Sequence, residues 1–106
     1  MKSKNEIRKF RPSRWWSNVQ ALRVDADISE VALSKLLGRN DNYINLAVKN
    51  GGSPNVADAI AIAEAFDTTI EELAFGNVGL ELRKKQLESE LQRIIEELED
   101  AKKGIE

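Results

Sequence analysis

The side chains best suited to chemistry in this chain are cations and amides rather than nucleophiles. The sequence has no cysteine and no histidine, so it lacks thiolate ligands and the commonest general base. Its carboxylates are spaced as on the solvent faces of helices, and no nucleophile–base pair or phosphate-binding loop accompanies them. The sequence therefore predicts a protein that is not an enzyme, with no catalytic residue, no metal and no cofactor.

Basic residues are concentrated at the start of the chain, in a segment we call the basic arm (residues 1–13), and in Arg14 directly after it. This region carries six basic residues and one acid, Glu6, whereas the whole chain has a net charge of −2. The imbalance favours contact with an anionic partner, although a solvated tail without a partner would have the same composition. The six are Lys2, Lys4, Arg8, Lys9, Arg11 and Arg14.

Five short helices are expected between residues 14 and 76, because no segment alternates as a strand would. Ser13 and Asn40 are placed to cap helices, and Ser53 would cap one that has Pro54 in its first position. Gly38 supplies the left-handed conformation that ends a helix cheaply. The expected helices are 14–26, 29–38, 41–49, 54–66 and 69–75.

Each of these helices has an apolar face that would point into a common core. The two tryptophans are better explained by packing than by stacking on bases, and Trp15 should be the more buried of the two. The expected inward residues are Trp15, Val19, Leu22 and Ala26, then Leu33, Leu36 and Leu37, then Ile44 and Ala47, and last Val56, Ala59, Ile60, Ala63 and Phe66.

After Gly79 the pattern changes to a heptad repeat, which predicts a coiled-coil helix over residues 77–106. Lys84 is the one polar residue in the a series. Arg83 could pair with Glu88 of a parallel partner, and Glu97 with Lys102. The residues expected to mediate self-association are Leu80, Leu87, Ile94 and Ala101 at d, with Leu91, Leu98 and Ile105 at a.

The heptads leave the type of association open. Leucine at a with Ile94 at d, and Ile95 at e, favours tetramers, whereas we expect a dimer as the basic unit. The helix could instead fold back onto the preceding domain, or pair with a different protein.

The segment from Glu30 to Lys49 is the most informative for function. It contains two short helices that meet at Gly38, with a turn of three or four residues, and Ser34 is small enough for a close crossing. This pattern predicts a helix-turn-helix, in which the first helix lies across the DNA backbone and the second enters the major groove.

The chain from about Asn18 to Phe75 resembles the lambda-repressor-like, or Cro-type, helix-turn-helix family. The resemblance implies an all-α bundle of four or five helices, here a compact five-helix DNA-binding domain at residues 14–76, and the coiled-coil helix that the heptads predict follows it. Members are mostly transcriptional regulators of phages, plasmids and bacteria. The residues that carry it are Ile28-Ser29, Leu33, Gly38, Ile44, Pro54, Ala63, Phe66-Asp67-Thr68-Thr69 and Glu72-Leu73.

The resemblance also implies which side chains contact DNA. Asparagine can pair with adenine, aspartate can accept from cytosine, and leucine can touch a thymine methyl. A flexible basic arm can follow the phosphates or enter the minor groove. The base-contacting residues would be Asn40, Asp41, Asn42, Asn45 and Leu46; the backbone-contacting residues would be Arg39, Tyr43, Lys49 and Asn50, with Arg8, Lys9, Arg11 and Arg14 at the N-terminal end.

Three positions depart from the family's pattern. Glu30 stands where a phosphate-binding glutamine is usual, and Arg39 stands where the family usually has an apolar residue. Asp41 would sit near phosphates, although an acid in the first turn of a helix also stabilises that helix. We therefore expect modest affinity from a single domain, increased by linking two domains through the coiled coil.

These inferences predict a cytoplasmic regulator that binds a palindromic DNA operator as a dimer, in the manner of a phage or mobile-element repressor. A protein antagonist could control it. The alternative is a protein-interaction module, antitoxin-like or anti-regulatory, that keeps the fold but has lost DNA. No stretch approaches the roughly 20 apolar residues of a membrane span, and no secretory signal is recognisable.

Overall fold

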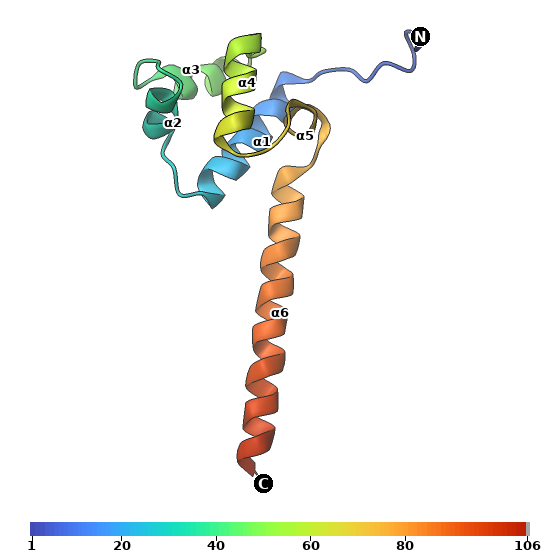
Figure 1. Ribbon diagram of the computed structural model, residues 1–106, viewed down its shortest axis with the longest axis vertical. Helices are drawn as coiled ribbons and strands as arrows, with labels where there is room; N and C mark the ends of the chain where they lie inside the picture. The colour runs from blue at the N-terminus through green and yellow to red at the C-terminus, as the bar shows by residue number, and fades with distance from the viewer. Residues whose placement is uncertain (106) are drawn as a thin grey trace.

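The structure is a computed structural model that describes the backbone of residues 1–105 and the side chains of residues 1–104. Over that range it contains helices and turns and no strand, and it ends in one long helix (Figure 1), as the sequence predicts. We call α1 to α5 the head. The helices are α1 (Pro12–Asp25), α2 (Glu30–Leu36), α3 (Tyr43–Asn50), α4 (Val56–Ala65), α5 (Ile70–Phe75) and α6 (Val78–Ile105).

Three helices of the head end in the same way. α1, α2 and α4 are each followed by a residue with positive φ, namely Asp27, Gly38 and Asp67. In each case the next amide bonds the carbonyl oxygen five residues earlier, at 2.9–3.0 Å. These are Schellman motifs. The prediction for Gly38 is confirmed, while the two aspartates show that a short polar residue can take the same conformation at a modest energetic cost.

The starts of α1 and α4 differ from the prediction. α1 begins at Pro12, so Ser13 lies inside the helix and caps nothing. α4 begins at Val56, because Asn55 accepts a hydrogen bond from the Asp58 amide at 2.7 Å and takes the capping role expected of Ser53. The proline in the first position of a helix is therefore Pro12 and not Pro54. Proline fits that position because its missing N–H would be unpaired there in any case.

The core forms around α1, and its largest fully buried side chains come from five helices. Trp15 is 1% exposed and Trp16 is 4% exposed, in the predicted order. The indole N–H of Trp16 donates to the Gly52 carbonyl at 2.7 Å, which ties the α3–α4 loop to α1. The residues exposed by less than 2% are Trp15, Val19, Leu33, Ser34, Ile44, Ile62 and Leu73.

Several predictions about the core are wrong. Leu36 is 61% exposed, and Ala26 is exposed as well. In α4 the prediction of Val56 and Ile60 as inward residues fails, since Ile62 fills that place. The sequence of α4 is apolar around most of its circumference, so periodicity alone does not choose a face.

The side chain of Asn18 connects α1 to the junction between α5 and α6. It is buried, and its amide nitrogen donates to the carbonyls of Leu73 at 2.9 Å and Gly76 at 3.0 Å. Its oxygen accepts from the Val78 amide at 3.1 Å. Asn18 thereby pairs polar backbone groups at the end of α5 and the start of α6, and this fixes the direction in which α6 leaves the head.

Only the first turns of α6 contact the head, and the rest of the helix projects away from it (Figure 1). The alternative in which α6 folds back is therefore wrong. Val78 is buried and Leu82 is half-buried; at 100° per residue they lie on the opposite side of α6 from Leu80 and Leu87. The predicted association residues are all exposed up to Ala101, while the side chain of Ile105 lies outside the described residues. No helix within the described range is long and apolar enough to cross a membrane.

Candidate nucleic-acid interface

The crossing of α2 and α3 is held by a buried serine. The hydroxyl of Ser34 donates to the Glu30 carbonyl at 2.8 Å and accepts from the Ile44 amide at 3.0 Å. This second bond pairs an amide in the first turn of α3, which has no acceptor within its own helix. The sequence predicts a small residue here for close approach, but the hydrogen bond could not be inferred from it.

The turn between α2 and α3 is longer than predicted and spans residues 37–42. Asn40 does not cap α3; its side-chain oxygen accepts from the Asn42 amide at 3.2 Å and stabilises a turn ahead of the helix. The three residues Asn40, Asp41 and Asn42 therefore precede α3 rather than forming its first turn. All three are exposed, at the end of α3 that would approach a groove.

The remaining predicted base-contacting residues differ in position. Leu46 is exposed, whereas Asn45 is half-buried and its amide donates to one Glu30 carboxylate oxygen at 3.4 Å. The other Glu30 oxygen accepts from Gln20 at 3.3 Å. Glu30 thus makes hydrogen bonds to both α1 and α3, which gives it a structural role.

Most cations on the surface formed by α2, α3 and the turn between them, which we call the α2–α3 surface, have an acidic neighbour. Lys35 lies 4.0 Å from Asp41, a pair so exposed that it adds little stability. Lys49 and Asn50 are exposed at the far end of α3. The α2–α3 surface therefore offers hydrogen-bonding groups more than positive charge.

Arg39 and Tyr43, both predicted to touch the DNA backbone, meet at a buried carboxylate that the sequence analysis missed. Nη2 of Arg39 donates to both oxygens of Asp58, at 3.1 and 3.2 Å, and the Tyr43 hydroxyl donates to the same carboxylate. The guanidinium also lies 4.9 Å from the centre of the Tyr43 ring. We call these three residues the Asp58 network; burial and the bond to Asp58 raise the pKa of Tyr43.

The basic arm contacts the head through Arg8. Arg8 pairs with Glu71 at 3.1 Å and lies 4.1 Å from the centre of the Phe75 ring. Arg14 donates to the Gly76 carbonyl at 3.2 Å. Lys9 and Arg11 are exposed. Of the four predicted phosphate contacts at this end, Arg8 therefore also anchors the arm, while Arg14 belongs to α1 and bonds the end of α5.

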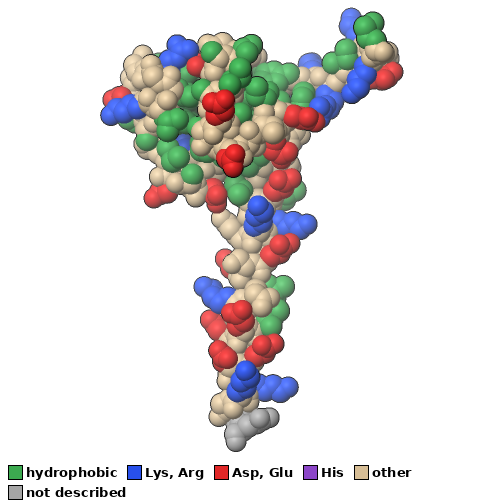
Figure 2. Space-filling view, in the orientation of Figure 1, with side chains coloured by type: hydrophobic (Ala, Val, Ile, Leu, Met, Phe, Trp, Pro, Cys, Tyr) green, Lys and Arg blue, Asp and Glu red, His purple; other side chains and the backbone are tan. Residues whose placement is uncertain are grey.

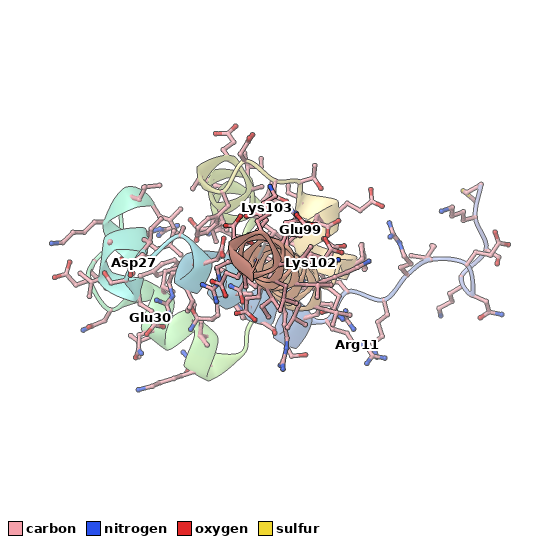
Figure 3. All side chains as sticks on the ribbon, turned by 90° about the horizontal axis from the view of Figure 1, so that it is seen from below. Arg11, Asp27, Glu30, Glu99, Lys102 and Lys103 are labelled. Carbon is pink, nitrogen blue, oxygen red and sulfur yellow. The ribbon has the colours of Figure 1, made fainter. Side chains whose placement is uncertain are left out.

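The arm and the α2–α3 unit lie on opposite sides of the head. Figure 1 shows the arm leaving the head away from α2 and α3, and Figure 2 shows its cluster of basic side chains. In the view along α6, Arg11 lies on one side of that helix and Glu30 on the other (Figure 3). The structure therefore does not bring the predicted backbone contacts of the arm and of α3 onto one surface.

The described residues contain no group of three acidic side chains that could hold a metal ion. The chain matches no family model, no curated protein and no solved structure. Its side chains present exposed amides on one surface and cations on another.

Proposed function

We propose that this chain is a sequence-specific DNA-binding regulator of transcription, of the Cro-type helix-turn-helix class, that acts as a dimer. The observation that carries the proposal is the α2–α3 unit. Ser34 and the Asp58 network fix α3 relative to α2 and α4, while Asn40, Asn42 and Leu46 remain exposed. A rigid support beneath exposed amides and an apolar side chain is what direct reading of base edges requires.

In this proposal α6 joins two copies of the chain. The exposed apolar stripe from Leu80 to Leu98 faces away from the head contacts, so a partner helix can pack there without displacing the head. In a parallel coiled coil both heads lie at the same end. Such a dimer would bind an inverted repeat with half-sites about one helical turn apart, or multiples of it.

A protein-interaction role is the second candidate, and the charges of the α2–α3 surface favour it. Arg39 is paired with Asp58, Lys35 lies near Asp41, and Glu30 adds a negative charge. DNA affinity depends strongly on cations near phosphates, and here those cations lie mainly on the basic arm. In this reading the surface would bind a protein, as an antitoxin-like or anti-regulatory module does.

Selection from a genomic DNA library, followed by a salt titration on the best fragment, separates the two candidates. The regulator should enrich an inverted repeat that it binds at least about a thousandfold more tightly than random DNA. Replacing Asn42 and Leu46 together with alanine should abolish that preference, whereas replacing the exposed Ser17 of α1 should not. Failure to enrich any sequence would remove the proposal and favour a protein partner.

A further inference from the structure

We infer that Asp58 and Tyr43 are positioning residues that hold Arg39 against one phosphate of the bound DNA. The inference rests on the proposed function and identifies a backbone-contact site within it. Asp58 itself does not touch DNA in this arrangement. It acts through the guanidinium, which would lie between the buried carboxylate and the phosphate.

Arg39 has donors left for a second anion. Its contacts with Asp58 are made through Nη2 alone, although a guanidinium carries five N–H groups. The side chain is 41% exposed, so part of it is open to solvent. Arginine is well suited to this geometry, because its planar fork can bind two oxyanions at once.

The carboxylate fixes where those donors lie. The Asp58 side chain is only 5% exposed, and a buried carboxylate is costly unless it is paired. Arg39 is its ion-pair partner and the Tyr43 hydroxyl its second donor, while Asn55 holds the Asp58 amide. Arg39 therefore cannot turn fully into solvent without leaving a buried charge unpaired. Its orientation is set before DNA arrives.

Arg39 also lies close to the residues that are predicted to contact bases. Arg39 lies in the α2–α3 turn, directly before the exposed Asn40, and Tyr43 is the first residue of α3. A phosphate held by Arg39 would set the depth and register at which the amides of the turn meet the bases. Phosphate contacts have this positioning effect in protein–DNA complexes generally.

The test measures the affinity for one duplex as a function of salt concentration, with full-length wild type, R39Q, D58N, Y43F and the double variant R39Q/D58N. R39Q should lower the slope of log affinity against log salt by about 0.9, the loss of one phosphate contact. D58N should weaken binding by about tenfold and lower the slope similarly. In the R39Q background D58N should change neither quantity further. Y43F should have the same effect as D58N in smaller degree.

The direction of the D58N effect is diagnostic. Removing a negative charge near DNA should tighten binding if only long-range electrostatics acts. The matched control E64Q removes such a charge from an exposed position on the same helix, and it should not weaken binding. Thermal unfolding of each variant identifies any change caused by loss of the fold, and Y43F provides the test if D58N does not fold.

The outcomes also separate this inference from the proposed function. If wild type binds no duplex, the proposed function fails. If wild type binds but R39Q leaves the salt slope unchanged, or D58N tightens binding, the positioning role is wrong while DNA binding stands.

Discussion

At the scale of single residues, the Asp58 network can be observed through its tyrosine, the only one in the chain. Burial and the hydrogen bond to Asp58 raise the pKa of Tyr43 above its ordinary value of 10.0, because both disfavour the phenolate. We expect the absorbance change of tyrosine ionisation to have its midpoint above pH 10 in the folded protein. In D58N the midpoint should move back toward 10, since the acceptor is then uncharged. A wild-type midpoint at or below 10 would contradict the hydrogen bond.

The sign of the accompanying stability change follows from linkage. Below pH 10 tyrosine is protonated in both the folded and the unfolded chain, so the bond to Asp58 contributes fully. As the pH rises further the unfolded chain ionises first, and the contribution is lost as the pH passes through the folded pKa. The difference in unfolding free energy between wild type and Y43F should therefore shrink above pH 10. Using the difference cancels the titration of lysines, which both proteins share.

Ser34 offers a second test at this scale. S34A removes the acceptor of the Ile44 amide from a fully buried position, so it leaves an N–H unpaired. The expected cost is about 1–3 kcal/mol in unfolding free energy, measured by denaturant titration. S17A, which makes the same change on the exposed face of α1, should cost less than about 0.5 kcal/mol. Equal effects of the two substitutions would show that Ser34 only fills space.

Local sequence patterns predicted some residue roles correctly and others wrongly, whereas roles that depend on distant residues could not be predicted. Gly38 as a helix end is a local feature and is confirmed, whereas the three local predictions of capping residues are wrong. Asp58 is separated from Arg39 by 19 residues, so their pairing exists only once α4 has packed against the turn. The predicted phosphate contacts Arg39 and Tyr43 are thereby shown to have internal partners as well, which no local pattern indicates.

At the scale of elements, the junction of α5 with α6 leaves no room for a side chain at Gly76. A Cβ atom on Gly76 would lie 2.5 Å from the backbone oxygen of Glu72, so alanine cannot fit without moving α5 relative to α6. We expect G76A to lower the unfolding temperature and to cost about 1–3 kcal/mol, as overpacking does.

The neighbouring Gly79 provides the matched control with the opposite sign. Its added Cβ would meet Ala21 at 3.7 Å, an ordinary contact, and it lies within α6. G79A should therefore stabilise the protein by about 0.5–1 kcal/mol, the usual gain from glycine to alanine in a helix. If both substitutions had the same sign, the close approach at Gly76 would not be the cause.

Helix existence was easier to predict than helix faces. The heptad repeat of α6 forms one apolar stripe, and that stripe is exposed. In α4, by contrast, Val56, Ile60 and Ile62 compete for the core, and the sequence offers no polar face to decide among them. Packing decides which of these residues is buried, because α4 must bring Asp58 to the turn and Ile62 to the core at the same time.

At the scale of the whole molecule, only the first turns of α6 contact the head, so dimerisation can be tested by substitutions further along α6. We call the a and d positions of the apolar stripe the seam. Its residues Leu91 and Leu98 are exposed and lie well beyond the part of α6 that contacts the head. L91E/L98E places charges in the seam and should yield a monomer with a folded head. Light scattering would report the mass, and thermal unfolding the integrity of the head.

The matched control adds the same two charges outside the seam. Ser89 and Gln92 occupy f and b positions when Leu91 is at a, so S89E/Q92E should leave the oligomer intact. If two heads bind one operator together, the seam variant should lose about 10²- to 10⁴-fold in operator affinity, since the second contact is no longer intramolecular. Its affinity for an isolated half-site should not change. Loss of half-site binding as well would mean that the head needs α6 pairing to fold, whereas unchanged operator affinity would mean that one head is sufficient.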